Sequence, residues 1–236
     1  MCIRDSISSA NVASNYAVTL GSLALSNGTG TASNYTLSGG THLFTINQKV
    51  LSLNGSKTYD GNTNASSGDL SIDSSTLIGS ETLILGGNTT GTLSSSNAGT
   101  RTIGSNANGI TLSNGLNGGL ASNYTLTGGT HSIVINQKTL DLTGTRQYDA
   151  SADVLSSDLT LSGLIGSETL NLSGTGSTLS PNVSSNYAIS LGTLTLADNT
   201  GQASNYTLSG GTHSFDITKR ILSFTGSRQY LSLIHI

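Results

Sequence analysis

The sequence predicts an all-β protein of tandem antiparallel β-sandwich-like modules, each of about 85 residues. Three observations favour this fold class: long strings recur along the chain, apolar residues alternate with polar ones, and helix-forming residues are scarce. A β-solenoid and β-grasp-like modules are the alternatives. Solenoid coils repeat every ~20–30 residues, which is much shorter than the period seen here, so separate modules are favoured.

The longest repeat is a ten-residue string, SNYTLSGGTH or SNYTLTGGTH, which occurs at 33–42, 122–131 and 204–213. A second string, LIGSETL, occurs at 77–83 and 164–170. The tyrosines of the first string are 89 and 82 residues apart, and this distance defines the module. We therefore divide the chain into the C-terminal part of a module, two complete modules and the first strand of another, at 7–47, 48–136, 137–217 and 218–230.

The two ends of the chain are interpreted as translated adapter DNA rather than native protein. One DNA string encodes MCIRD and its reverse complement encodes LSLIH, and this string resembles a transposase end used in sequencing adapters. Residues 1–6 and 231–236 are therefore left out of the fold prediction. Met1 and Cys2 then carry no information about compartment or disulfides.

The strand prediction follows from period-two alternation. In GGTHLFTI, His42, Phe44 and Ile46 share one face, and Gly- and Asn-rich clusters supply the turns. The chain has only two Glu and four Lys, which disfavours helices. The distance from the SNYT tyrosine to the next tyrosine is 24 residues in all three copies, which predicts paired strands. The distances from Ile78 to Tyr124 and from Ile165 to Tyr206 differ, at 46 and 41, so we expect a variable surface loop near 94–120.

The composition excludes several classes of partner. Only 9% of the residues are charged, against about 25% in an average soluble domain, and the formal net charge is −3. A nucleic-acid partner would need a basic surface, and no apolar run reaches the ~20 residues of a membrane-spanning helix. We expect neither nucleic-acid binding nor membrane insertion.

The tyrosines occupy two repeated positions, one after Ser-Asn and one after Lys-Thr or Arg-Gln. We interpret them as structural residues that fill a module core or cover a sheet end, rather than as an aromatic platform for a ligand. The structural repeat positions are Tyr35, Tyr59, Tyr124, Tyr148, Tyr206 and Tyr230.

The repeated histidines and glutamates are also interpreted as structural. The histidines of GGTH occur once per module, whereas a zinc site needs about four clustered ligands; they are His42, His131 and His213. Glu81 and Glu168 occupy one repeated turn, where a solvated turn residue is a better prediction than one of the paired carboxylates of a glycosidase. We predict no catalytic residues and no cofactor.

One loop has a weak resemblance to a calcium site. Asp60, Asn62 and Asn64 match the start of a D-x-N-x-N loop, but Ala65 and Ser71 stand where such a loop needs Gly and Glu. In the second copy the corresponding residues are Asp149, Ser151 and Asp153. A hydrogen-bonded Asx turn is the favoured interpretation, and Asp60, Asn62, Asn64, Asp149 and Asp153 remain the candidate metal ligands.

The order of these motifs resembles the YDG repeat of filamentous-haemagglutinin-type adhesins of Gram-negative bacteria. The resemblance is carried by GSKTYDGNT at 55–63, GTRQYDAS at 144–151, NAGTRTI at 97–103, and the LIGSETL and SNYT strings. It covers nearly all of 7–230, although the second copy has Ala150 where the first has Gly61. The resemblance implies β-rich repeats in a large secreted or surface-anchored protein, with no catalytic residues.

The function predicted from this reasoning is structural: a stalk segment of a secreted or cell-surface bacterial adhesin, whose partners are the neighbouring modules of the same chain. The alternative is a module that binds a host-surface glycan or protein, assisted by calcium. An enzyme is not expected, because residues 7–230 contain no Cys, GxSxG, HExxH or phosphate-binding loop motif.

Overall fold

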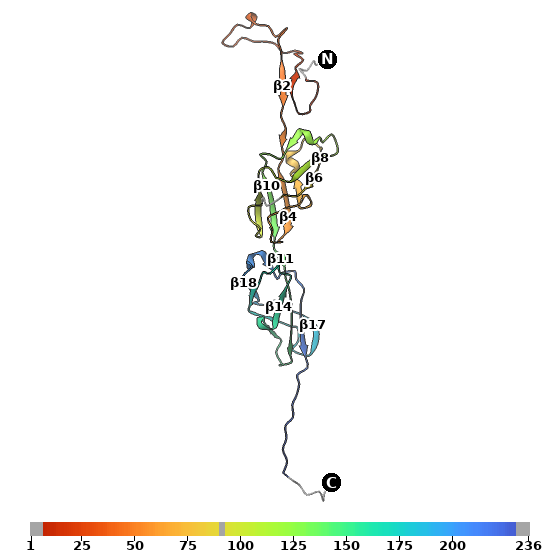
Figure 1. The fold of residues 1–236 in the computed structure, drawn as a ribbon, viewed down its shortest axis with the longest axis vertical. Helices are drawn as coiled ribbons and strands as arrows, with labels where there is room; N and C mark the ends of the chain where they lie inside the picture. Colours follow the sequence, from red (N-terminus) through yellow and green to blue (C-terminus); the bar gives the residue numbers. More distant parts are fainter. Residues whose placement is uncertain (1–6, 90–92, 230–236) are drawn as a thin grey trace. The chain divides into compact units, whose positions relative to one another are not determined.

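The computed structural model describes residues 7–89 and 93–229, so Tyr230 and both predicted adapter segments lie outside the described residues. The chain divides into two compact units, Met1–Asn136 and Gln137–Ile236. In the described ranges every regular element is a β-strand or a short 3-10 helix (Figure 1). The all-β fold class is confirmed. None of the helices in these ranges has the length and apolar character needed to cross a membrane.

The first unit begins with a two-stranded sheet. Strand β1 (Ala13–Ala17) pairs antiparallel with β2 (Leu43–Ile46), and the 3-10 turn η1 (Ala32–Asn34) lies between them in the sequence. Within the described residues these two strands form a sheet of their own.

The complete module of the first unit has one four-stranded sheet, in the order β5-β4-β10-β7, and two two-stranded sheets, β6-β8 and β3-β9. Its strands are β3 (Lys49–Val50), β4 (Leu53–Thr58), β5 (Leu70–Ile72), β6 (Leu83–Gly87), β7 (Gly99–Ile103), β8 (Ile110–Asn114), β9 (Tyr124–Thr125) and β10 (His131–Asn136). Its 3-10 turns are η2 (Ser67–Asp69), η3 (Ser74–Thr76) and η4 (Ala121–Asn123).

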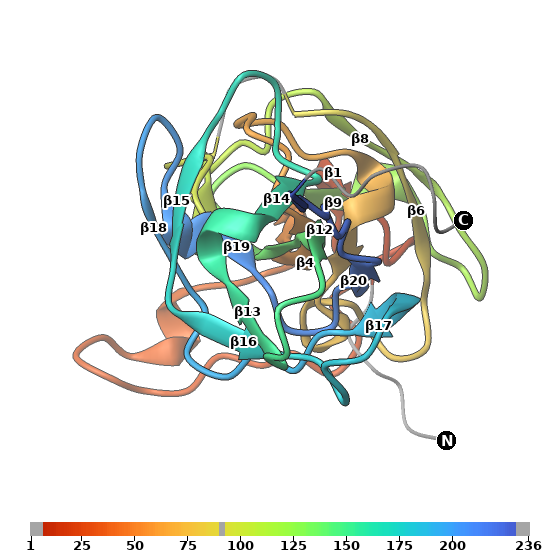
Figure 2. The ribbon, with the colours of Figure 1, turned by 90° about the horizontal axis from the view of Figure 1, so that it is seen from below.

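The second unit repeats this arrangement, with a four-stranded sheet in the order β14-β12-β20-β17. The two-stranded sheets β13-β16 and β15-β18 can be followed in Figure 2, and β11 pairs with β19. The strands are β11 (Lys138–Thr139), β12 (Asp141–Gln147), β13 (Asp153–Leu155), β14 (Leu159–Ser162), β15 (Leu170–Ser173), β16 (Thr175–Ser177), β17 (Ser184–Ala188), β18 (Thr195–Asp198), β19 (Tyr206–Thr207) and β20 (His213–Thr218). The 3-10 turns are η5 (Ser156–Asp158) and η6 (Ala203–Asn205).

The central strand pair of each complete module is parallel, whereas the other pairs of its four-stranded sheet are antiparallel, as the sequence predicts. Strand β4 pairs parallel with β10, and β12 pairs parallel with β20. Parallel neighbours need a long crossover between them, and here the rest of the module forms it. The first and last strands of each module therefore lie side by side and point in the same direction.

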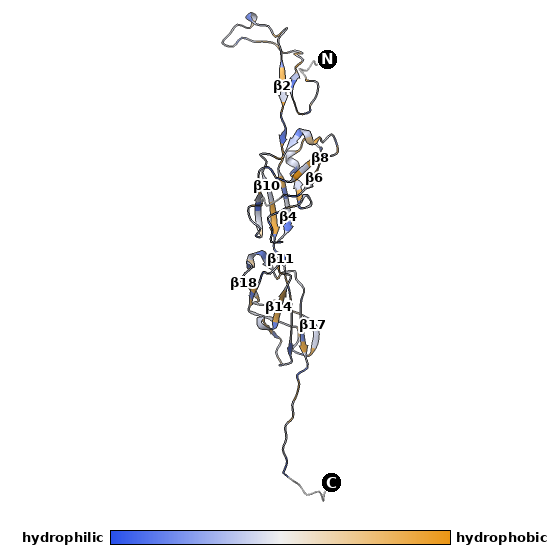
Figure 3. Cartoon of the chain, viewed as in Figure 1, coloured by the Kyte–Doolittle hydropathy of each residue, from blue (hydrophilic) through white to orange (hydrophobic). Residues whose placement is uncertain are grey.

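Alternation along these strands builds the core. In β10 the side chains of His131, Ile133 and Ile135 are buried, whereas Val134 between them is exposed. The parallel partner strands add buried leucines to the core, Leu53 in the first unit and Leu142 in the second. Figure 3 shows hydrophobic residues within the strands. The alternation predicted for residues 42–46 therefore recurs with a buried face in β10, whereas in β2 itself both Leu43 and Phe44 are exposed.

The predicted variable loop near 94–120 is not one loop, because β7 and β8 both lie inside it. Part of the length difference falls in a short connection. Residues 115–120 join β8 to η4, whereas the shorter stretch 199–202 joins β18 to η6. Extra residues between paired strands leave the strand register unchanged, which is why a length difference alone does not locate a loop.

Candidate functional site

The loop that follows β4 is wrapped around a buried lysine. Lys57 Nζ donates to Asp60 Oδ1 and Oδ2 at 2.8 and 3.1 Å, to the carbonyl and Oδ1 of Asn62 at 3.1 and 3.2 Å, and to the carbonyl of Asn64 at 2.7 Å. Lys57 is only 8% exposed. We call this group of oxygens and the cation at its centre the cation cage.

The cation cage brings together the three candidate calcium ligands Asp60, Asn62 and Asn64, but it gathers them around the chain's own ammonium group. Asx turns shape the loop, because Asn62 N donates to Asp60 Oδ1 at 3.1 Å and Asn64 N donates to Asn62 Oδ1 at 2.8 Å. Among the described residues no group of three or more His, Cys, Asp and Glu side chains is placed to hold a metal.

The second unit builds the same cage around Arg146. Its guanidinium donates to the carbonyls of Ser151 and Asp153 and lies 3.3 Å from Asp149 Oδ1. It also lies over the ring of Phe215, with 5.5 Å from Cζ to the ring centroid. The candidate ligand Asp153 therefore contributes its backbone carbonyl to the cage. The sequence holds a signal for this site that the motif search missed: a basic residue stands two positions before the tyrosine, at Lys57, Arg146 and Arg228.

The cation stabilises the ionised form of Asp60. Burial alone would raise the pKa of this carboxyl group, but the hydrogen bonds from Lys57 and Asn62 and the charge of Lys57 lower the pKa below its ordinary value. The Asp60 side chain is therefore held as a carboxylate beside the Lys57 amine.

The third residue of the YDG triplet has a conformational role. Gly61 has φ +77°, and Ala150 at the same position of the second unit has φ +71°. Glycine adopts this left-handed conformation without steric cost, whereas alanine pays ~1–2 kcal/mol. Both copies nevertheless adopt the same left-handed turn at this position.

A tyrosine and a glutamate form a second repeated contact. Tyr124 Oη accepts the N–H of Ile78 at 3.2 Å and donates to Glu81 Oε2 at 2.5 Å. In the second unit Tyr206 Oη accepts from Ile165 N at 3.0 Å and donates to Glu168 Oε2 at 2.7 Å. The expectation that these glutamates are solvated turn residues is wrong, because each ties its turn to the buried tyrosine.

Both tyrosines hold their protons more tightly than a free tyrosine. Burial of the hydroxyl is the larger cause, and its hydrogen bond to the glutamate carboxylate is the next. Together they raise the pKa of Tyr124, and they raise the pKa of Tyr206 to about 12. Because the pKa of a tyrosine in the unfolded chain is ~10, each raised pKa contributes stability that is fully present below pH ~10. That stability is lost as the pH rises towards 12.

We predict that Tyr206→Phe destabilises the second unit by about 1–3 kcal/mol, because Ile165 N and the Glu168 carboxylate lose their hydroxyl partner. Between pH 10 and 12 the wild type should lose stability while the variant loses less. Chemical denaturation at pH 7, 10 and 12 measures both effects. Tyr16→Phe is the control, since that hydroxyl contacts only an exposed carbonyl; equal losses in the two variants would contradict the prediction.

The repeated histidines join strands. His131 Nδ1 accepts the N–H of Leu53 at 3.1 Å, and its Nε2 lies 2.8 Å from the carbonyl of Leu126. In the second unit His213 makes the same two contacts, with Leu142 N at 3.2 Å and Leu208 O at 2.7 Å. With Nδ1 as the acceptor, Nε2 is the ring nitrogen that donates to the leucine carbonyl. Each histidine bridges the first strand of its module to the turn before the last strand.

The remaining predicted tyrosine positions vary in burial. Tyr59 is 4% exposed, Tyr148 is 36% exposed and Tyr35 is 70% exposed. Tyr230 lies outside the described residues. Tyr124 and Tyr206, which follow Ser-Asn as Tyr35 does, are both buried.

Within the first unit, residues 7–47 and the module that follows them meet at a hydrogen-bonded joint. Asn123 Oδ1 accepts from Val12 N at 2.8 Å, and Asn123 Nδ2 donates to Asn11 Oδ1 at 3.0 Å. Gln48 Nε2 donates to the carbonyls of Ser122 and Tyr124 at 3.1 and 2.9 Å. The SNYT string therefore forms a corner that docks on the preceding module.

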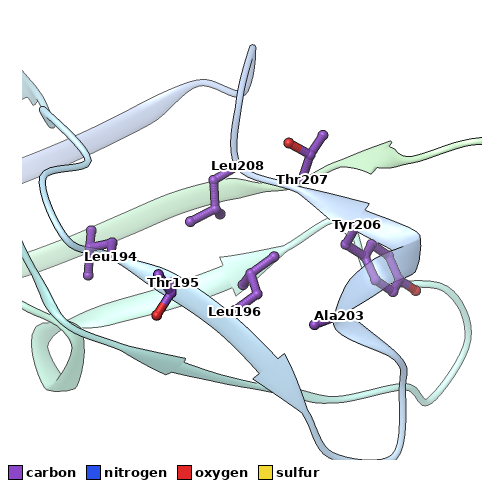
Figure 4. A pocket seen from close by; sticks show the side chains of 7 residues that line it. All are labelled: Leu194, Thr195, Leu196, Ala203, Tyr206, Thr207 and Leu208. Atoms are coloured by element: carbon purple, nitrogen blue, oxygen red, sulfur yellow. The ribbon is translucent and has the colours of Figure 1, made fainter.

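The second unit carries a surface hollow beside the corner formed by η6 and β19. Figure 4 shows Leu194, Leu196 and Leu208 on one side of the hollow and the Tyr206 ring, beside Ala203, on the other. The Tyr206 hydroxyl points away from the leucines towards its turn contacts. The lining offers aliphatic groups and two threonine hydroxyls, Thr195 and Thr207, and it contains no carboxylate or imidazole.

Comparison with known protein families gives one result. The family model described as YDG domain matches residues 45–132 and 134–213. Each matched range holds one cation cage, one Tyr–Glu contact and one bridging histidine. No curated protein and no solved structure matches the chain significantly.

Proposed function

Because the chain belongs to the YDG domain family and carries two tandem copies, we propose that it is a load-bearing stalk segment of a large secreted or surface-anchored bacterial adhesin. The observation that carries this proposal is the parallel pairing of the first long strand of each module with its last strand. The assignment to an adhesin rests on the resemblance of the repeats to those of filamentous-haemagglutinin-type proteins.

Parallel pairing of these strands suits a module that bears tension. Tension enters a module near the start of its first long strand and leaves through the end of its last strand. In the second unit these are β12 and β20, which are in register from Leu142↔His213 to Gln147↔Thr218. Force along the chain pulls the two strands in opposite directions along their length. The ladder hydrogen bonds then share the load and must break together.

Short joints support the same proposal. Strand β2 ends at Ile46 and β3 begins at Lys49, and the side chain of Gln48 between them is bonded to the corner of the next module. A two-residue joint held in this way restricts bending within the first unit. The weakly charged surface, rich in Ser, Thr and Asn, gives each module a hydrated exterior without strong charge repulsion.

Single-molecule force spectroscopy tests the proposal. We predict that the second unit unfolds at a higher force when it is pulled through the chain ends than when it is pulled between cysteines at Gln147 and Thr218. Those two residues are register partners at the same end of the ladder, so pulling them apart breaks the hydrogen bonds one at a time. Cys2 is replaced by serine in both experiments. Equal forces in the two geometries would count against a load-bearing role.

A glycan array with and without calcium separates the stalk from the binding-module alternative. The proposal expects no carbohydrate binding by residues 7–229. Specific binding to one class of glycan would replace the stalk with a recognition function.

A further inference from the structure

Asn-Gly pairs occur five times in the first unit and not at all in residues 137–236. Glycine has no side chain to obstruct its backbone nitrogen, so in such a pair this nitrogen can attack the amide carbon of the preceding asparagine. The five asparagines are Asn27, Asn54, Asn108, Asn114 and Asn117. Because the following residue is the same in every pair, the local structure decides which asparagine reacts.

Hydrogen bonds restrain four of the five side chains. Their partners lie at 2.6–2.9 Å and are Ala32 N for Asn27, Ser71 Oγ for Asn54, Ala121 N for Asn114 and the Ser80 carbonyl for Asn117. Attack requires the asparagine side chain to turn towards the next backbone nitrogen. A side chain that is bonded elsewhere reaches this geometry less often and therefore reacts more slowly.

The glycine is restrained as well in three of these four pairs. Gly28 N donates to the Gly30 carbonyl at 3.2 Å, and Gly115 N donates to the Gly119 carbonyl at 3.0 Å. Gly55 lies inside β4 and belongs to its ladder. In these pairs both reacting groups are held by the fold.

Asn108 and Gly109 lie in a different environment. They are the two exposed middle residues of a turn that Ile110 N closes by donating to the Ala107 carbonyl at 2.9 Å. Ala107 and Ile110 are buried, at 0% and 8% exposure, so the ends of the turn are fixed while its middle is in water. In the part of the chain that the structure describes, the Asn108 side chain and the Gly109 N–H make no hydrogen bond.

We propose that Asn108 is a site of spontaneous deamidation, with water as the co-reactant. The Gly109 nitrogen attacks Asn108 Cγ, the bond from Cγ to Nδ2 breaks, and the amide group leaves as ammonia with the proton of the Gly109 N–H. Water then opens the succinimide ring at either of its two carbonyls. One product is aspartate on a normal backbone, and the other is isoaspartate, in which the main chain runs through the side-chain carbons.

The isoaspartate product disturbs a close backbone contact. It adds one carbon to the main chain directly before Gly109. A Cβ on Gly87 would collide with the Gly109 carbonyl oxygen, and a Cβ on Gly109 would collide with the carbonyl oxygen of Asn88, so this glycine has no room to shift. The β6–β8 pairing ends here, at Gly87↔Ile110. We expect deamidation to loosen this end of the two-stranded sheet.

Peptide mapping of the full chain by mass spectrometry, after incubation at pH 8, tests the site, because it measures the exchange of amide for acid at each asparagine. Asn108 should react about tenfold or more faster than Asn54 and Asn114, and a tenfold difference corresponds to ~1.4 kcal/mol of barrier, the size of one or two hydrogen bonds. In urea the five pairs should react at similar rates, since their restraints are gone. Faster reaction of another asparagine in the folded chain, or the same preference for Asn108 in urea, overturns the proposal.

Two glutamine substitutions provide a matched pair for the structural consequence. Glutamine reacts far more slowly because its ring would be one atom larger, so Asn108→Gln removes the site and Asn117→Gln leaves it in place. After the same incubation, wild type and Asn117→Gln should exchange amide hydrogens in 83–87 and 110–114 faster than the same proteins freshly prepared, whereas Asn108→Gln should keep its fresh protection. Equal losses in the two variants, or unchanged protection in wild type that has lost the Asn108 amide, overturn the expected loosening of β6–β8.

Discussion

Replacing Gly55 by alanine is expected to destabilise the first unit by about 3 kcal/mol or more. Gly55 lies in β4 opposite Leu70 of β5, and a Cβ on Gly55 would fall 2.0 Å from the carbonyl oxygen of Asp69. The neighbouring atom is backbone, so no side-chain rotation relieves the contact. The β4–β5 pairing and the adjacent 3-10 turn η2 would have to separate.

Gly104→Ala is the matched control in the same unit. No atom lies within 4 Å of the position that its Cβ would take, and its φ is not positive. This substitution should leave stability unchanged or raise it by up to ~1 kcal/mol, since alanine restricts the unfolded chain. Hydrogen exchange read by mass spectrometry separates the units: Gly55→Ala should lower protection in 49–136 and leave 138–218 unchanged. Similar protection in the two variants would contradict the argument.

This close approach shows what the sequence reveals and what it does not. Gly55 and Gly144 each follow a stretch of alternating apolar and polar residues, where a glycine by itself suggests that the strand ends in a turn. In the structure both residues lie inside strands, where another backbone comes within contact distance. The repeat of a glycine at one position could be seen in the sequence, but the neighbour that requires it lies about fifteen residues away.

The alternation of buried and exposed residues along a strand was therefore predictable, but the strands and side chains that each residue contacts were not. Period-two alternation gave β10 its buried and exposed faces, because that pattern depends only on the residue and its neighbours. The parallel pairing of β4 with β10 depends on residues about 78 positions apart, and no short motif records strand direction. The Tyr124–Glu81 contact escaped prediction for the same reason: both residues were recognised as repeated, but in separate strings.

The favoured Asx-turn interpretation of the acidic loop is confirmed, but the cation inside the cage was not anticipated, because it lies before the loop in the sequence. The oxygen atoms of a D-x-N-x-N loop favour a hard cation, and in both units the loop oxygens do surround a cation. The cation is an ammonium group in the first unit and a guanidinium group in the second. In both units it contacts the carbonyls of the same two loop positions, Asn62 and Asn64 or Ser151 and Asp153.

Lys57→Met should therefore destabilise the first unit by about 2–4 kcal/mol, because the Asp60 carboxylate and the inward-facing carbonyls lose their partner. Lys57→Arg should retain most of the stability, since Arg146 fills the same cage in the second unit. Urea denaturation of the two variants, followed by hydrogen exchange in 49–136, measures the difference. Equal losses in the methionine and arginine variants would show that the lysine acts through its size and not through its charge.

The pH dependence distinguishes the charge of Lys57 from its packing. The pKa of Asp60 is lowered in the folded chain, so its contribution to stability is present above the ordinary value near 4 and is lost as the pH falls through the lower, folded value. Stability of the first unit should thus fall more steeply below pH 4 in the wild type than in Lys57→Met, where the carboxyl has no cation to bind. Lys57→Arg should keep the wild-type slope. An identical acid profile in all three proteins would mean that the loop is held by its Asx turns alone, and that the cation only occupies a cage that would form without it.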